Sequence, residues 1–369
     1  KVLIVLSAVA ITTILVTITL SPIASTAILI TTVTTLVFVP RFILSSTDHC
    51  KIALIVSKHR QKERTLKFQS LFFFFWKGGY MRWRKTKITD KHGGYTKFKI
   101  YEPKERIIMA SEYKDRVVHQ WYVEKFIKPY FVPQFISTSY AGIEGRGMHK
   151  ASKDVQKTMR SSKSKWKNYY ILKMDITKYF QNIDKRILWK ILKRKMKNKK
   201  LLWLTREILL STEGMVGPPL GNYTSQMFAN IYLNELDQYV KHKLKCKYYY
   251  RYMDDMVIMC ENKEIAKDIL NNITKFLKEN LKLTLNSKTR IFKDIQGVNF
   301  CGYKINEKRL KIRHTSKCRM KRKLKRYTRQ LKEGKITLPE IQRSIAGWLG
   351  YVKHADSYKL RKSMFYIEG

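Results

Sequence analysis

Two adjacent aspartates form the pattern in this chain with the clearest chemical potential. Asp254 and Asp255 follow the run Tyr250–Tyr252 and precede the apolar run Met256–Met259. Because residues of both runs favour β-strands, the pair is predicted to lie at the turn of a β-hairpin. Two carboxylates held side by side are costly unless a cation neutralises them, and carboxylate oxygens suit divalent metals. The pair therefore predicts a metal site, whereas Asp-Asp in an ordinary turn is usually only solvated.

A third carboxylate, Asp175, ends the strand-like run Tyr169–Met174. One interpretation is that it caps the following helix, which is a common role for aspartate. The alternative is that it joins Asp254 and Asp255 from a neighbouring strand. Together these three carboxylates would hold two Mg²⁺ ions about 4 Å apart, the arrangement used for in-line nucleotidyl transfer.

The order of these motifs resembles that of a reverse transcriptase. Asp175 with Phe180 comes first, the run 217–226 second, and Tyr252-Met253-Asp254-Asp255 third. The resemblance covers about residues 95–363. Within this family, Ser225-Gln226 leading into the run 228–237 is most similar to the enzymes of diversity-generating retroelements.

The resemblance implies an α+β fold of the right-hand polymerase type. Residues 95–306 would form the fingers and a palm of antiparallel sheet plus helices, and residues 307–369 a basic helical thumb. Hydrophobic periodicity adds local predictions. These are strands at 95–102 and 283–290, and helices at 111–130, 224–239 and 264–281.

The resemblance also implies roles in binding the incoming dNTP. Lys104 and Arg106 match finger-strand cations that hold the triphosphate, and Arg106 is the better match because arginine binds phosphate oxygens in pairs. Phe180 matches an aromatic beneath the sugar that selects deoxynucleotides, although Tyr179 adjoins it and a core role for Phe180 stays open. Lys288 matches a general acid for the pyrophosphate, and a plain surface lysine is the alternative.

The loop Gly217–Gln226 is predicted to place Gly221 and Gln226 near the nucleotide and the template base. Many reverse transcriptases have glutamine at the position of Leu220. Diversity-generating enzymes have an aliphatic residue there. A side chain that cannot hydrogen-bond should discriminate less between nucleotides, so Leu220 is hypothesised to lower fidelity opposite template adenines.

Three residues are predicted to contact the template or the primer. Arg146 lies between two glycines that allow the backbone to approach a phosphate, and a basic surface turn is the alternative interpretation. Gly302 matches the primer-grip hairpin, where a missing side chain permits close approach. Tyr252 precedes the aspartate pair.

Composition is consistent with a polyanionic partner. The chain has 369 residues, 75 basic against 28 acidic, and a formal net charge of +47. Such an excess favours nucleic-acid binding, although an AT-rich genome would also enrich lysine. The five cysteines show no Cys-x-x-Cys spacing, which argues against zinc and suits a reducing cytoplasm.

Residues 1–94 form a separate N-terminal region in which positions 2–40 carry no charged residue. This stretch exceeds the ~20 apolar residues that one transmembrane helix needs. The alternatives are an uncleaved signal-like segment and translated upstream DNA, with Met81 as the true start. A cytoplasmic polymerase has no evident need for an anchor.

The sequence thus predicts an RNA-directed DNA polymerase, of the error-prone, adenine-mutagenic type found in diversity-generating retroelements. It would use an RNA template, a DNA or RNA primer, dNTPs and a small basic accessory protein. The alternatives are a group II intron or retron-type reverse transcriptase and a non-catalytic RNA chaperone. Against the intron type stand Leu220, Ser225-Gln226 and the lack of a maturase or nuclease extension after Gly369.

Overall fold

A computed structural model describes residues 54–55, 71–77, 80–86, 93–101 and 105–365. The hydrophobic stretch 2–40, with its predicted membrane span, and Lys104 lie outside these ranges. Among the residues that are described, no helix combines the length and the apolar character needed to cross a bilayer. The chain divides into two units, Lys1–Ile88 and Thr89–Gly369.

The first unit contains a small antiparallel sheet. Its strands are β1 (Leu54–Ile55), β2 (Leu71–Lys77) and β3 (Tyr80–Thr86), in this order. The aromatic run Phe72–Trp76 lies in β2 and pairs with the basic strand β3. The remaining elements belong to the second unit.

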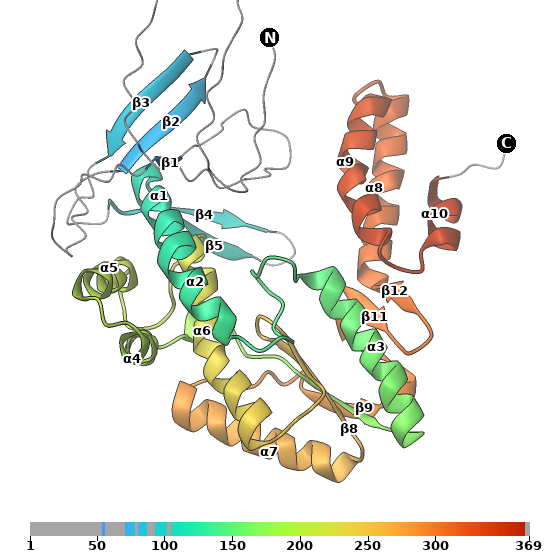
Figure 1. The fold of residues 1–369 in the computed structure, drawn as a ribbon. Helices are drawn as coiled ribbons and strands as arrows, with labels where there is room; N and C mark the ends of the chain where they lie inside the picture. The colour runs from blue at the N-terminus through green and yellow to red at the C-terminus, as the bar shows by residue number, and fades with distance from the viewer. Residues whose placement is uncertain (1–53, 56–70, 78–79, 87–92, 102–104, 366–369) are drawn as a thin grey trace, which may run out of the picture. The chain divides into compact units, whose positions relative to one another are not determined.

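A four-stranded antiparallel sheet forms the centre of the second unit (Figure 1). Its spatial order is β7 (Tyr249–Tyr252), β8 (Asp255–Cys260), β6 (Tyr170–Met174) and β9 (Arg290–Lys293). Residues Met256–Cys260 are all buried. A strand buried in this way has both faces covered, which agrees with the continuous apolar run in its sequence.

Helices cover the two faces of this central sheet. One face packs on α3 (Met148–Trp166), through a core that includes Ile171, Val257 and Met259. On the other side lie α6 (Tyr223–Gln238) and α7 (Lys263–Leu281) (Figure 1). The sequence predicts α6 and α7 to within one residue at each end, because their apolar positions recur with helical spacing.

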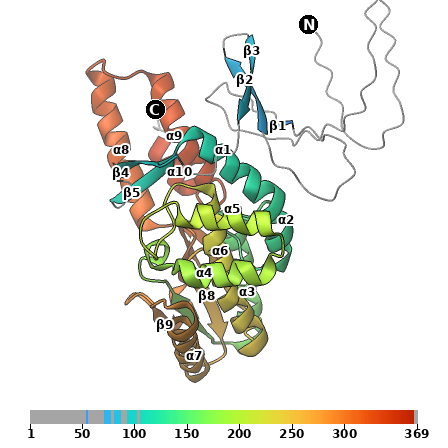
Figure 2. The same cartoon turned by 90° about the vertical axis from the view of Figure 1, so that its left-hand side faces the viewer.

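The remaining helices of this region surround α6. The predicted helix 111–130 is a chain of α1 (Tyr113–Tyr122), a π-helical segment (Val123–Ile127) and α2 (Lys128–Phe131). Later in the chain come α4 (Lys185–Lys195) and α5 (Lys199–Leu210). Figure 2 shows α4 and α5 side by side, nearest the viewer.

The predicted strand 283–290 is wrong. Leu285 makes only an isolated bridge to Ile176, and β9 begins at Arg290. Between them the chain turns, with the Thr289 N–H donating to the Asn286 carbonyl at 2.9 Å. The reason is local, because asparagine favours turns and Asn286 also bonds to the end of β6.

A β-hairpin docks onto the loop that precedes α6. Its strands are β4 (Tyr95–Ile100) and β5 (Arg106–Ser111). The Met109 N–H donates to the Leu220 carbonyl at 2.7 Å. Gly221 makes this approach possible, since it has φ +124° and a Cβ there would lie 2.8 Å from the Met109 carbonyl oxygen.

The C-terminal part begins with a second small sheet. It contains β10 (Val298–Phe300), β11 (Tyr303–Ile305) and β12 (Leu310–Ile312). Then follow α8 (His314–Lys332), α9 (Leu338–Val352) and α10 (Tyr358–Phe365) (Figure 1). Met320, Tyr327 and Ile345 form a small separate core, against which Trp348 packs. Trp348 is therefore partly buried against this core.

Replacing Gly221 with alanine should destabilise the contact between β5 and the loop before α6. The left-handed backbone and the close Met109 carbonyl both oppose a side chain, so Gly221→Ala should cost about 1–3 kcal/mol in urea unfolding. Gly347→Ala is the matched control, because Gly347 lies within α9 with open space around it and should gain up to ~1 kcal/mol. Equal stabilities of the two variants would contradict the docking argument.

Candidate active site

Two of the predicted carboxylates, Asp175 and Asp254, meet at one end of the central sheet. Asp175 directly follows β6, and Asp254 lies in the turn between β7 and β8. The register explains their proximity, since Met174 of β6 pairs with Met256 of β8. Burial, followed by the negative charge of Asp175, raises the pKa of Asp254. The ionised pair is therefore costly in the protein alone, and its oxygens suit a divalent cation.

Asp255 faces a different partner, which is Lys173 of β6. The two side chains form an ion pair, and the Lys173 ammonium lies 5.1 Å from the centre of the Phe300 ring. Burial lowers the pKa of Lys173 to about 7, while the charges of Asp175 and Asp254 oppose that decrease. Lys173 thus places a partly buried amino group beside Asp255, within reach of the charges of Asp175 and Asp254.

The structure therefore brings two of the three carboxylates together and engages the third with a lysine. Within the described ranges, no group of three or more His, Cys, Asp or Glu residues is arranged to hold a metal ion. Asp175 and Asp254 fit a metal as oxygen ligands, and metal binding by Asp255 stays a prediction. Sequence reasoning missed Lys173, although a lysine within a buried strand two residues before Asp175 is a usable signal.

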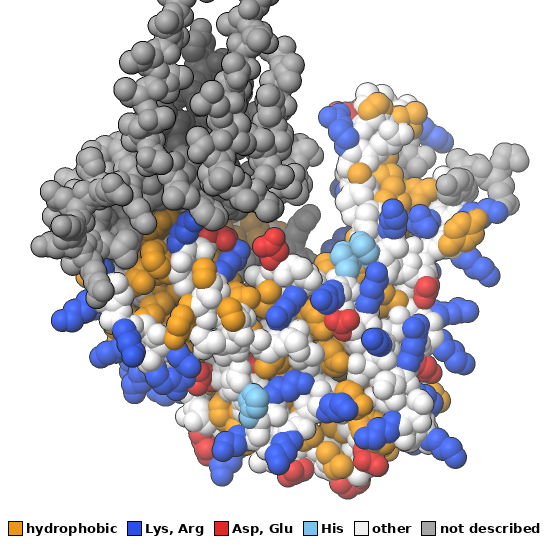
Figure 3. Space-filling model, viewed as in Figure 1, with side chains coloured by type: hydrophobic (Ala, Val, Ile, Leu, Met, Phe, Trp, Pro, Cys, Tyr) orange, Lys and Arg blue, Asp and Glu red, His pale blue; other side chains and the backbone are white. Residues whose placement is uncertain are grey.

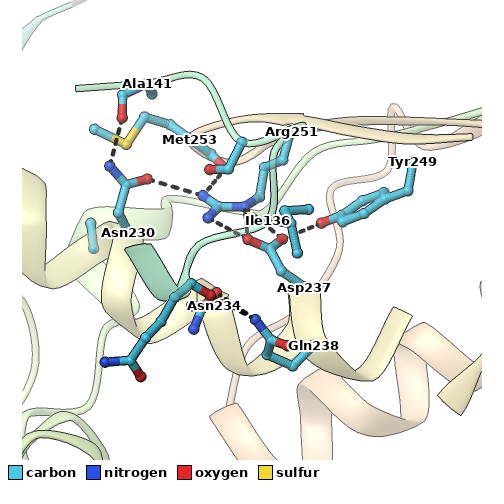
Figure 4. A network of polar contacts seen from close by, with 12 residues as sticks. Ile136, Ala141, Asn230, Asn234, Asp237, Gln238, Tyr249, Arg251 and Met253 are labelled. Carbon is cyan, nitrogen blue, oxygen red and sulfur yellow. Dashed lines mark hydrogen bonds and ion pairs between the residues drawn. The ribbon is translucent and has the colours of Figure 1, made fainter. Parts of the chain in front are cut away.

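A buried network fixes the turn that carries Asp254 (Figure 4). Arg251 and Asp237 are fully buried, and Nη2 of the arginine lies 2.6 Å from the Asp237 carboxylate. Nη1 of the same arginine donates to the Met253 carbonyl and to Asn230 Oδ1, both at 3.1 Å. The Tyr249 hydroxyl donates to Asp237 at 2.7 Å. The network therefore ties the β7–β8 turn to α6.

This tie matters because the turn has an unfavourable backbone. Met253 has φ +53°, in the left-handed region. Two-residue hairpin turns usually place glycine or asparagine at such a position. The hydrogen bond from Arg251 to the Met253 carbonyl stabilises the turn despite that cost. Sequence reasoning missed Arg251 and Asp237, and the available signal was an arginine in a buried strand next to the aspartate pair.

The predicted nucleotide-binding residues occupy several elements around Asp254. Arg106 begins β5, is exposed, and is close enough for its positive charge to oppose part of the rise in the pKa of Asp254. Tyr179 is buried and donates its hydroxyl to the Ala229 carbonyl at 2.5 Å. Phe180 is half-buried. Tyr179 is thus the core aromatic of the pair, which leaves Phe180 for the predicted contact with the sugar.

The loop residues predicted to line the nucleotide site differ in exposure. Leu220 is half-buried, while Gly221 and Gln226 are exposed. The Leu220 carbonyl accepts a hydrogen bond from the Met109 N–H of β5. The β4–β5 hairpin therefore helps to position Leu220. Their contacts with a nucleotide stay predictions.

Lys288 lies in the turn 286–289, which is hydrogen-bonded to the backbone of Asp175. Its side chain is exposed, and its backbone N–H donates to Asn286 Oδ1 at 3.0 Å. The Asn286 N–H in turn donates to the Asp175 carbonyl at 2.7 Å. Asn286 thus links the predicted general acid to the strand end, a role that sequence reasoning missed.

The predicted nucleic-acid contacts make internal contacts as well. Arg146 Nη1 donates to the carbonyls of Ile136 and Ser139, at 2.8 and 2.9 Å, and so braces its own loop. The Gly302 carbonyl accepts a hydrogen bond from the Tyr351 hydroxyl at 2.6 Å. Gly302 has φ +84°, and a Cβ there would lie 2.8 Å from that hydroxyl, so the backbone conformation and the packing against α9 both favour glycine.

Tyr252, the third predicted contact, is half-buried at the end of β7. Nucleic-acid binding by Arg146, Gly302 and Tyr252 stays a prediction.

The chain belongs to the reverse transcriptase (RNA-dependent DNA polymerase) family. The model of that family matches residues 91–305, which is more than half of the 369 residues. The match contains the whole central sheet and every predicted catalytic residue.

Two curated proteins are distant relatives. The chain is 24% identical to the COX1/OXI3 intron 2 protein of Saccharomyces cerevisiae, over 38% of this chain and 24% of that protein. It is 25% identical to protein YkfC of Escherichia coli K12, over 57% of this chain and 67% of YkfC. The chain thus spans about a quarter of the yeast relative's length.

A similar solved structure is a telomerase from Candida tropicalis in complex with a fragment of telomeric RNA. The identity is 13% and the TM-score 0.46, over 77% of this chain and 56% of the telomerase chain.

Removing the buried arginine should be much more costly than removing an exposed one. Arg251→Met leaves the Asp237 carboxylate buried without its cation, which typically costs about 3–5 kcal/mol. Arg329 is the matched control, because it is largely exposed in its pair with Glu333 and Arg329→Met should change stability by less than ~1 kcal/mol. Urea unfolding measures both. Similar losses in the two variants would show that Arg251 does not anchor the turn.

Proposed function

We propose that this protein is an RNA-directed DNA polymerase that works by two-metal nucleotidyl transfer. The observation that carries the proposal is the convergence of Asp175 and Asp254 at one end of the sheet, in a chain of the reverse transcriptase family. Bound Mg²⁺ would stabilise charge on the attacking and leaving oxygens of an in-line displacement. The right-hand assignment follows, with the β4–β5 hairpin in the fingers, the central sheet as the palm and α8–α10 as the thumb.

Each proposed role follows from the position of a side chain. Asp175 and Asp254 would hold the metal ions, and Asp255 would support them. Arg106 would bind the triphosphate, because its charge already acts on Asp254. Lys288 would protonate the pyrophosphate from the turn next to Asp175.

The template, the primer and the dNTPs are part of the same proposal. A net charge of +47 suits such polyanions. A small basic accessory protein is proposed as a further partner. A non-catalytic RNA chaperone is the weaker alternative, because a destabilising carboxylate such as Asp254 has no purpose in a chaperone.

Asp254→Asn should separate catalysis from folding. The change removes a charge that burial and Asp175 disfavour, so the metal-free variant should be as stable as the wild type or up to ~1 kcal/mol more stable. Primer extension on an RNA template should fall by at least ~10³-fold. Mg²⁺ should raise the melting temperature of the wild type but not that of the variant.

The control for this experiment is Asp268→Asn, which removes an exposed carboxylate from α7. It should keep both the activity and the Mg²⁺-dependent rise in melting temperature. Undiminished cDNA synthesis by Asp254→Asn would refute the proposed function.

A finer proposal is that the enzyme is the error-prone type of a diversity-generating retroelement. It is supported by Leu220, which replaces a glutamine of many reverse transcriptases, and by Ser225-Gln226 at the start of α6. The alternative is a group II intron or retron-type enzyme, which the similarity to an intron protein and to YkfC favours. The misincorporation rate on adenine-rich templates discriminates between the two types of enzyme.

Leu220→Gln tests the finer proposal. An added amide that hydrogen-bonds near the base pair should lower misincorporation opposite template adenine by roughly tenfold, the equivalent of ~1.4 kcal/mol. Errors are counted by sequencing the cDNA made from one RNA template. Leu210→Gln is the control, because Leu210 is an exposed leucine at the end of α5 and should leave the error spectrum unchanged. An unchanged spectrum in Leu220→Gln would sink the fidelity hypothesis and leave the polymerase proposal intact.

A further inference from the structure

The helices α4 and α5 form a strongly basic surface that the polymerase mechanism does not use. Between Lys185 and Leu210 the sequence contains a single acidic residue, Glu207. The exposed cations of this surface are Arg186, Lys190, Lys193, Arg194, Lys195, Lys197, Lys199, Lys200 and Arg206, of which Arg186 pairs with Asp184 and Arg194 with Glu235. We call these two helices with their connection the α4–α5 face. A surface with this much positive charge attracts polyanions when it is not simply solvated.

The α4–α5 face lies away from the C-terminal helices. In Figure 1, α4 and α5 are on the left of α6 and the helices α8–α10 are on the right. Figure 2 confirms this arrangement, because α4 and α5 are nearest the viewer in that turned view. Figure 3 shows Lys and Arg side chains gathered at the left, where these two helices lie. The surface is therefore separate from the proposed thumb.

Hydrogen bonds hold the α4–α5 face in place. Asp184 caps α4, and Asn198 caps α5 by accepting from the N–H groups of Lys200 and Leu201. The buried Lys185 donates to the Thr212 and Gly214 carbonyls at 2.8 and 2.9 Å, which fastens the chain beyond α5 to the start of α4. The surface is thus preorganised, which lowers the entropic cost of binding a ligand.

One large aromatic side chain is exposed among these cations. Trp203 of α5 is 42% exposed. Residues three and four positions apart share a helix face, so Lys199 and Arg206 flank Trp203 on its own helix. An exposed indole between cations matches the way in which proteins bind single strands, with bases stacked on aromatic rings and phosphates on lysine and arginine.

We propose that the α4–α5 face binds single-stranded nucleic acid outside the catalytic site, with Trp203 stacking on a base and the flanking cations contacting phosphates. A duplex has no free base to offer to Trp203, and an acidic protein has carboxylates but no planar bases. Template RNA beyond the copied segment is the expected source of the strand. The binding site itself does not depend on the proposed polymerase activity.

The test uses the full-length protein, saturated with a short RNA–DNA hybrid so that the catalytic site is occupied. Fluorescence anisotropy then measures the affinity for a labelled single-stranded RNA of mixed sequence and for the same sequence as DNA. Trp203→Ala should weaken binding roughly tenfold, since one stacked base contributes ~1–3 kcal/mol. Trp203→Phe should restore most of the affinity.

A charge variant tests the phosphate contacts. The triple change Lys193→Gln, Lys197→Gln and Lys199→Gln should reduce the slope of log affinity against log salt by about 2, since each lost contact to a single strand removes ~0.7. The matched control neutralises three exposed lysines of α7, which are Lys267, Lys275 and Lys278. It changes net charge equally and should leave the slope within about 0.5 of the wild-type value.

The outcomes are distinct. Loss of affinity in the α4–α5 variants but not in the α7 control supports the proposal, and preference for RNA or DNA then identifies the source of the strand. Equal behaviour of the two lysine triples overturns it. Equal weakening of single-stranded and double-stranded RNA by Trp203→Ala overturns the stacking contact. Melting temperatures of all variants check that each one is folded.

Discussion

The buried ion pair between Arg251 and Asp237 is the interaction on which the candidate site depends. Both side chains are removed from water, so each charge would be very costly without the other. Their pairing ties the β7–β8 turn to α6 and supports the left-handed backbone of Met253. The position of Asp254 is therefore set by contacts made well away from the reacting groups.

Charge balance distinguishes the three aspartates. Asp255 has an internal counter-ion in Lys173, whereas Asp175 and Asp254 repel each other at the sheet end. The protein thus retains an electrostatic cost at the end of the central sheet, where we propose that nucleotidyl transfer takes place. Such a cost is typical of functional sites, where stability is sacrificed for ligand binding.

The positions of the basic residues, and not the total positive charge, indicate a binding surface. An AT-rich genome would add lysines throughout the chain, and the net charge of +47 does not separate that bias from selection for binding. Composition bias does not place an exposed tryptophan between cations on α5, in a pair of helices that each have a side-chain cap and that a buried lysine at the start of α4 ties to the chain beyond α5. The net charge of the chain therefore does not account for the α4–α5 face, whereas binding of a single strand does.

The sequence by itself determined the hairpin with its aspartate pair, Asp175 at a strand end, and the helices α6 and α7, because these depend on local periodicity and turn chemistry. It failed at residues 283–290, where Asn286 turns the chain to bond with Asp175. Only the tertiary structure decided that Asp255 faces Lys173 and that Arg251 meets Asp237. Each of these pairs joins segments that are far apart in the chain. Strand register and helix packing decide which residues meet, and no local sequence pattern encodes either of them.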